Sequence, residues 1–168
     1  GSSGRADDRA LAFDGTTYVD LGNDNSLIQG LIYDNAMTMA FWVKLTATEP
    51  MEICKTLNNG NGLVIAIFSG WAQHRPSPHS LLFELRDDAG QYWTHHINKP
   101  SLFDGKWHHL AWVVENSANR CVRVYVDGSE AAVTHEAEGS PAHFSRVEHY
   151  LPFGACMNRG KLTTRFKG

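Results

Sequence analysis

The sequence predicts an all-β protein, a two-sheet antiparallel β-sandwich, and two observations lead to this fold class. Apolar residues recur at every second position in several runs, and pairs or groups of residues containing Gly separate these runs. A period of two places one face of a strand on a core. Many short strands joined by tight turns are typical of a sandwich or a barrel.

The clearest run has large apolar residues at every second position, namely Met37, Met39, Phe41, Val43 and Leu45. The residues between them, Thr38, Ala40, Trp42 and Lys44, belong to the other face of the same strand. The same period recurs at 81–86 and 121–127. Turns are expected where Asp or Asn adjoins Gly, at 14–15, 59–62, 87–90, 104–105 and 127–128. The polar stretch 136–143 is expected to be a loop.

Composition and net charge limit the classes of function that the protein can have. The chain has 168 residues, 42% hydrophobic and 20% charged, which suits one globular domain. A net charge of −3 argues against nucleic acid as a partner. No run of 18 apolar residues is present, which argues against direct membrane insertion. We expect residues 1–8 to be a flexible leader or tag remnant and residues 9–168 to form the domain.

The three cysteines, Cys54, Cys121 and Cys156, leave at least one thiol without a partner inside the chain. They could all be buried free thiols, or two of them could form one disulfide. Their spacing forms no zinc-type cluster.

Four stretches together resemble the laminin-G-like jelly-roll domains of the concanavalin A-like lectin/glucanase superfamily. They are Ala-Leu-Ala-Phe-Asp-Gly at 10–15 with Tyr-Val-Asp-Leu-Gly at 18–22, Met-Ala-Phe-Trp-Val-Lys at 39–44, Asp-Gly-Lys-Trp-His-His-Leu-Ala at 104–111, and Val-Arg-Val-Tyr-Val-Asp-Gly at 122–128. The resemblance runs from about Ala10 to Gly168. It implies an extracellular or cell-surface recognition module within a larger protein.

The resemblance also implies a missing element. In this family a Phe-x-Gly motif is followed by a last strand that pairs beside the first one, and here Phe166-Lys167-Gly168 ends the sequence. We therefore expect the final family strand to be missing and the edge beside 10–13 to be unpaired. A partner segment could supply that strand.

Carbohydrate binding is the leading expectation, because a sugar site needs an exposed aromatic ring beside polar side chains. The candidates are Trp71, His74 and Arg75 in the 69–80 loop, and Tyr92, Trp93 and His95 on the strand that starts at Gln91. The remaining tryptophans, Trp42, Trp107 and Trp112, are expected to serve the fold. Protein adhesion is the alternative, because fold does not determine ligand.

The resemblance implies a calcium site as well, since relatives often bind Ca²⁺ through loop oxygens. Calcium takes six to eight oxygen ligands, so several loops must converge. The candidate ligands are Asp14, Asp20, Asn23, Asp24, Asn58 and Asn59.

Catalysis is not expected. Glucanases of the same superfamily carry a Glu-x-Asp-x-Glu string, and this chain has none. Glu136 and Glu138 have the right spacing for two carboxylates on one face, which leaves a glycoside hydrolase-related enzyme as a minor alternative.

Overall fold

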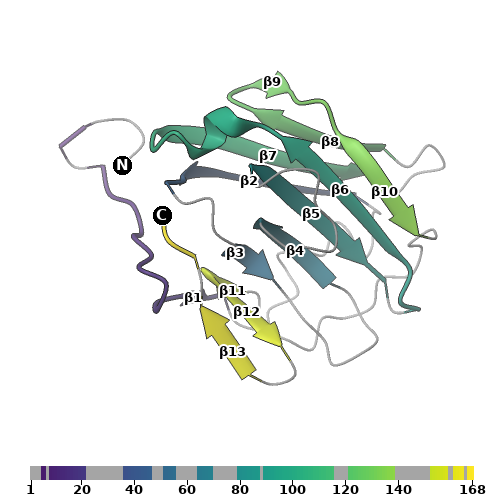
Figure 1. Ribbon diagram of the computed structural model, residues 1–168, viewed down its shortest axis with the longest axis horizontal. Coiled ribbons are helices and arrows are strands. Elements are labelled where there is room, and N and C mark those ends of the chain that lie inside the picture. The colour runs from purple at the N-terminus through teal and green to yellow at the C-terminus, as the bar shows by residue number, and fades with distance from the viewer. Residues whose placement is uncertain are drawn as a thin grey trace.

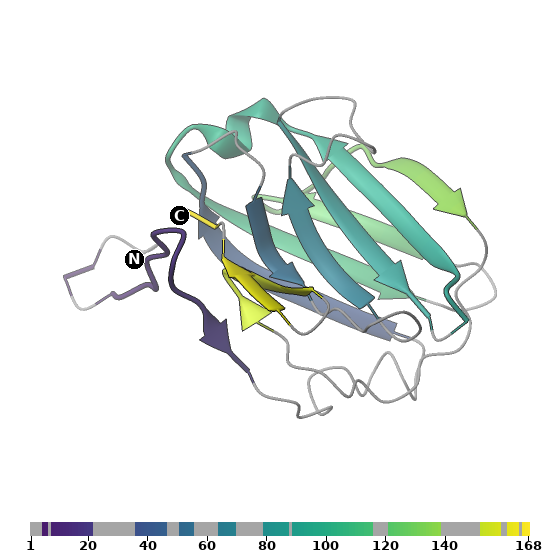
Figure 2. The ribbon, with the colours of Figure 1, turned by 60° about the horizontal axis from the view of Figure 1, so that its bottom comes forward.

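The computed structural model is a sandwich of two β-sheets that face each other across one core, seen as two layers in Figures 1 and 2. The structure describes residues 5–6, 8–21, 36–46, 51–55, 64–69, 79–87, 89–115, 121–138, 152–158, 161–164 and 166–168. The predicted fold class is confirmed.

The strands are β1 (Val19–Asp20), β2 (Ala36–Lys44), β3 (Met51–Lys55), β4 (Val64–Ser69), β5 (Ser80–Arg86), β6 (Tyr92–Asn98), β7 (Trp107–Glu115), β8 (Cys121–Val126), β9 (Ser129–Glu130), β10 (Thr134–Glu138), β11 (Pro152–Phe153), β12 (Ala155–Asn158) and β13 (Lys161–Thr164), with a short 3-10 helix, η3, at Pro100–Phe103. The larger sheet has the order β1-β11-β3-β4-β5-β6-β10, with β12 beside β3 and β13 beside β12. The smaller sheet has the order β2-β7-β8-β9. Their pairings are antiparallel except for that of β12 with β3.

The core is built by the alternation that the sequence shows. In β2, Met37 and Val43 are buried, while Met39 and Phe41 pack against the core from partly buried positions. The intervening residues of β2 are exposed. From the larger sheet, Phe83 meets Trp112 of β7 with ring centroids 5.5 Å apart, so the two layers interlock through aromatic rings.

The hairpin between β8 and β9 turns at the predicted Asp-Gly pair. Asp127 and Gly128 both have positive φ, 52° and 77°. Two successive positive φ values define the tight hairpin turn that matches strand twist, and Gly accepts this conformation without a Cβ clash.

The two ends of the described chain meet at one edge of the sandwich (Figure 1). The Phe13 N–H donates to the Gly168 carbonyl at 2.9 Å, and the Gly168 N–H donates back at 3.1 Å. Residues 10–12 are exposed, and no strand pairs with them in the part of the chain that the structure describes. The expected unpaired edge at 10–13 therefore does not extend to Phe13, and the missing final strand stays a prediction.

One expectation about the polar stretch is corrected. Residues 136–138 are not a loop but belong to β10, which pairs along its whole length with β6; residues 139–143 lie outside the described residues. The partner strand imposes the extended conformation here, because local composition alone favours a loop.

A substitution in the core and one on the exposed face of the sandwich should lower the free energy of unfolding by different amounts. We expect Phe83→Ala to lower the free energy of unfolding by about 3–5 kcal/mol, since it removes a fully buried ring. Trp42→Ala, on the exposed face, should cost less than about 1 kcal/mol. Urea denaturation of both variants measures the difference, and similar losses would contradict the assignment of faces.

Candidate functional site

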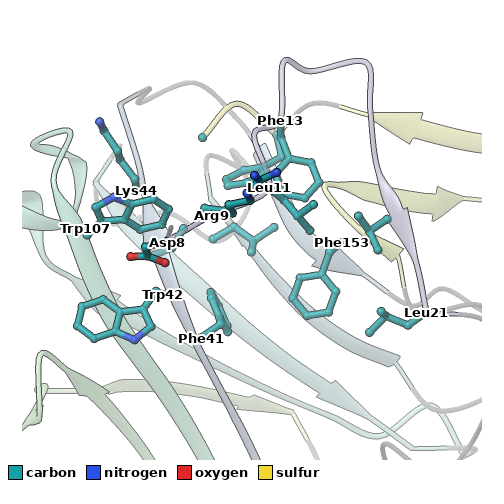
Figure 3. Close-up of a pocket in the computed structure, with 16 residues that line it drawn as sticks. Asp8, Arg9, Leu11, Phe13, Leu21, Phe41, Trp42, Lys44, Trp107 and Phe153 are labelled. Carbon is teal, nitrogen blue, oxygen red and sulfur yellow. The ribbon is translucent and has the colours of Figure 1, made fainter. Parts of the chain in front are cut away.

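An apolar groove of about 410 Å³ runs between β2 and the segment 8–13. Its apolar lining is supplied mainly by Leu11, Phe13, Phe41, Ile53, Phe153 and Phe166. Figure 3 shows Leu11, Phe13 and Phe153 on one side and the rings of Trp42 and Trp107 on the other. Segments from both sheets and from both ends of the described chain thus meet at this groove.

One wall of the groove is the open edge of the smaller sheet. β2 pairs with β7 on one side and, among the described residues, has no strand on the other; its end at Phe41–Lys44 lines the groove. In an antiparallel ladder, alternate residues point their N–H and C=O groups to opposite sides of the strand. The alternate residues of β2 therefore have main-chain groups directed away from β7.

The hydrogen bonds of β7 show which residues these are. The His109 carbonyl accepts from the Asp127 N–H at 2.9 Å, so the backbone of His109 points toward β8. The backbone of His108 then points toward β2, where its register partner is Val43. It follows that Val43 bonds to β7, while Trp42 and its alternate neighbours direct their N–H and C=O groups outward. The set that faces the open edge is Thr38, Ala40, Trp42 and Lys44.

The position of Gly168 agrees with this assignment. A Cβ built on Gly168 would lie 2.6 Å from the Lys44 carbonyl oxygen. That oxygen therefore points away from β7, toward the groove.

The other wall carries apolar surface in contact with solvent. Leu11 is 63% exposed, and Leu21 is also among the exposed large hydrophobic residues. A single exposed leucine is common on a protein surface and carries no meaning by itself. Here two exposed leucines and a row of partly buried aromatic rings line one groove, which marks a candidate interaction surface.

Two cations also line the groove. Arg9 and Lys44 belong to its lining, and within the described ranges neither makes an ion pair or a side-chain hydrogen bond. Asp8 lines the groove as well, so the groove has an apolar floor and charged side chains of both signs.

Trp42 was missed as a functional candidate, because it was expected to serve the fold. The structure leaves Trp42 53% exposed, with its ring 5.3 Å from that of His109, while Trp112 is buried and Trp107 half-buried. The signal was available in the sequence: Trp42 occupies the face opposite Phe41 and Val43 in a strict period of two.

The predicted sugar-binding residues do not form one platform where they can be seen. Trp71, His74 and Arg75 lie outside the described residues. On β6, Trp93 and His95 are each only 4% exposed and face the core, with ring centroids 6.1 Å apart. Tyr92 is half-buried on the opposite face of β6. The rings of Trp93 and His95 are therefore packed inside the sandwich rather than presented to solvent.

Of the predicted calcium ligands, the structure describes Asp14 and Asp20; Asn23, Asp24, Asn58 and Asn59 lie outside the described residues. Asp14 holds a turn: its Oδ1 accepts hydrogen bonds from the backbone and hydroxyl groups of Thr16 and Thr17. The hydrogen bonds from Thr16 contribute most to lowering the pKa of Asp14 to about 2. Among the described residues, no three Asp, Glu, His or Cys side chains gather as metal ligands. Calcium binding stays a prediction.

His108 lies between two carboxylates and could be mistaken for a catalytic residue. Its Nδ1 is 2.8 Å from Asp127 Oδ2, and its Nε2 is 3.1 Å from Asp104 Oδ1. A general base needs one ring nitrogen free to reach a substrate. Both nitrogens are engaged here, so His108 joins the turn at Asp104 to the turn at Asp127 instead.

The same cluster shifts the pKa values of its members. Burial disfavours the charged form of His108, but the hydrogen bonds and charges of Asp127 and Asp104 outweigh it, so its pKa is raised. The hydrogen bond from His108 is the main reason that the pKa of Asp104 falls to about 2 and that the pKa of Asp127 is lowered.

Cys54 is a free thiol buried in the core, 4.0 Å from the sulfur of Met39. Burial raises the pKa of this thiol to about 12. Because the thiolate is the reactive form, Cys54 serves packing rather than chemistry. Cys121 and Cys156 lie in β8 and β12.

Comparison with known proteins identifies the family. Residues 13–160 match the family model Laminin_G_3, described as the concanavalin A-like lectin/glucanases superfamily. The chain belongs to this family, whose laminin-G-like domains are generally non-catalytic and serve as lectin-like or adhesion modules. No curated protein matches the chain in sequence. No helix among the described residues is long and apolar enough to cross a membrane.

The His108 cluster makes stability depend on pH. Since its pKa is raised by folding, its contribution is complete below the unfolded pKa near 6.5 and is lost as pH rises through the folded value. We expect His108→Ala to cost about 2 kcal/mol at pH 6 and less at pH 8, because its hydrogen bonds are charge-assisted at the lower pH. Urea denaturation at both pH values measures this, and an equal cost at the two would contradict it.

Proposed function

We propose that this domain is a non-catalytic recognition module and that its groove binds a segment of another protein. One observation carries the proposal: the apolar groove lies beside a strand edge whose backbone groups have no partner strand among the described residues. An extended polypeptide can satisfy both features at once, because it offers apolar side chains and a matching row of N–H and C=O groups.

The chemistry of the groove favours a protein over a sugar. A sugar presents many hydroxyl groups, and each one placed against apolar surface loses hydrogen bonds to water. The floor of the groove is made by rings such as those of Phe41 and Phe153 and by Ile53. These side chains suit aliphatic or aromatic groups of a partner, whose burial contributes about 25 cal/mol per Å².

Two further points belong to this proposal. The engaged ring nitrogens of His108 support the view that the domain is not an enzyme. The family's role as a lectin-like or adhesion module supports an extracellular or cell-surface setting, where a partner protein would be met as part of a larger assembly.

The proposal is tested by selecting binders from a displayed random-peptide library and measuring their affinities by fluorescence polarisation. We expect Leu11→Glu to weaken the selected peptides at least about tenfold, because it places a charge in the groove. Leu11 is 63% exposed, so the fold should tolerate the change.

Tyr18→Glu provides the matched control. Tyr18 is also an exposed large hydrophobic residue, at 44%, but it does not line the groove. Equal losses in the two variants, or no selected peptide at all from a folded sample, would overturn the proposal.

Carbohydrate binding remains a second candidate, favoured by the exposed ring of Trp42 beside His109. An exposed indole can stack on the apolar face of a sugar, and the predicted loop residues Trp71, His74 and Arg75 offer a second platform.

A glycan array, run with calcium and again with chelator, tests the second candidate. We expect any glycan binding to be lost in Trp42→Ala or in Trp71→Ala and retained in Leu11→Glu. Loss with chelator would add the proposed calcium site. An array without signal in either condition would leave carbohydrate binding unsupported.

A further inference from the structure

We infer that His108 is a pH-dependent clasp: its doubly protonated ring holds the turn at 104–106 against the turn at 127–128, and the turn at 104–106 loosens when the ring loses one proton. The clasp is part of the fold and operates whether or not the groove is occupied. It makes the conformation of this end of the sandwich depend on pH near neutrality.

The hydrogen bonds of the cluster require two protons on the ring. A carboxylate accepts hydrogen bonds and has none to donate. Asp127 Oδ2 lies 2.8 Å from Nδ1 of His108, and Asp104 Oδ1 lies 3.1 Å from Nε2, so each ring nitrogen faces an acceptor. A neutral imidazole carries one N–H and can serve only one of the two carboxylates. Both hydrogen bonds therefore form together only in the imidazolium.

Both carboxylates stay ionised near neutral pH. The hydrogen bond from His108 is the main reason that the pKa of Asp104 is about 2 and that the pKa of Asp127 is lowered. Asp104 approaches the ring from the turn before β7, and Asp127 approaches it from the turn after β8; the charges of both raise the pKa of His108. On β2, the register partner of His108 is the apolar Val43. Lys106 contacts Asp104 rather than the ring, with its Nζ 3.2 Å from Oδ2.

Loss of one proton releases Asp104 before Asp127. The contact of the ring with Asp127 is the shorter one, and the His109 N–H also holds the Asp127 carboxylate by donating to its Oδ1 at 2.9 Å. The remaining ring N–H therefore stays with Asp127. Nε2 then directs a lone pair at Asp104 Oδ1, and two acceptors at this distance repel each other.

The turn at 104–106 has one other main-chain tie among the described residues. The Gly105 N–H donates to the Leu45 carbonyl at 3.0 Å. The Lys106 N–H donates to Asp104 Oδ1 at 2.8 Å, but this bond lies within the turn. Leu45 follows β2 and Trp107 begins β7, so loosening of the turn reaches the end of the β2–β7 ladder.

The direction of the pH effect follows from these contacts. Burial disfavours the charged ring, but the hydrogen bonds and charges of the two carboxylates outweigh it, so the pKa of His108 is raised above 6.5. The clasp is closed at pH values below that raised pKa and opens as the pH rises through it. In strong acid it opens again, because Asp104, with a pKa of about 2, becomes protonated.

The protonation state is tested by following the ring nitrogens of His108 by nitrogen-15 NMR in a pH titration. We expect both nitrogens to carry protons at pH 6 and the midpoint to lie above 6.5. Asp104→Asn should lower the midpoint by about one pH unit, because it removes one of the two charges beside the ring. A ring with a single proton at pH 6 would overturn the inference.

The opening of the turn is tested by amide hydrogen exchange of Gly105. Its protection, corrected for the intrinsic effect of pH on exchange, should fall at least about tenfold between about pH 6 and pH 8.5. Gly90 is the matched control, because it also has a positive φ, 79° against 76°, and its N–H donates to the Asp87 carbonyl at 3.1 Å. Its protection should stay constant. Equal losses at the two glycines, or no loss at Gly105, would rule out the clasp.

His108→Gln separates the clasp from a general effect of pH. Glutamine does not titrate, so the protection of Gly105 should become independent of pH over the same range. If this variant does not fold, Asp104→Asn gives the same comparison, because its side-chain amide can donate to the deprotonated Nε2 and keep the turn attached. A tenfold loss of Gly105 protection that persists in either folded variant shows that His108 is not the switch.

Discussion

The pairing of β2 with β7 is the constraint on which both the core and the groove depend. It runs in register from Ala36 opposite Glu115 to Lys44 opposite Trp107. Side chains and backbone groups of a strand alternate with the same period of two. The register of pairing therefore decides both which side chains are buried and which backbone groups point away from the neighbouring strand. Burying Met37 and Val43 therefore exposes Trp42, and it also turns the N–H and C=O groups of Trp42 toward the groove. A slip of one residue would reverse the core and the binding edge together.

His108 fixes this register at one end of β7. Its ring joins Asp104, in the turn that precedes β7, to Asp127, in the turn that follows β8. The Asp127 carboxylate also accepts from the His109 N–H at 2.9 Å. Three backbone segments are thus tied together beside the Lys44 end of β2. The hydrogen bonds of this histidine stabilise the fold, and the fold positions the residues that line the groove.

Period and turn chemistry were enough to predict the fold, because β2 and β8 each bury one face more than the other. They could not show that Trp93 and His95 are packed, since β6 lies between two strands and has few exposed side chains on either face. They also could not show that Phe13 pairs with Gly168, a contact between opposite ends of the sequence. The groove is formed by that contact and by β2 together, so no local pattern reveals it. Of the features of the groove, only the outward position of Trp42 could be predicted from the sequence.

An exposed strand edge is ordinarily protected against pairing with other chains, by shortness, by charge or by a covering segment. β2 is long, and its exposed residues include one charge, at Lys44. The segment 8–13 forms the opposite wall of the groove, and its Leu11 adds exposed apolar surface there. Among the described residues no strand covers the outer edge of β2, and an edge of this length and composition favours pairing with an extended segment. Lys44 shares the groove with Arg9 and Asp8, so this end of β2 lies beside charges of both signs. Specificity at a strand edge comes from side chains, because the backbone hydrogen bonds are the same for every sequence.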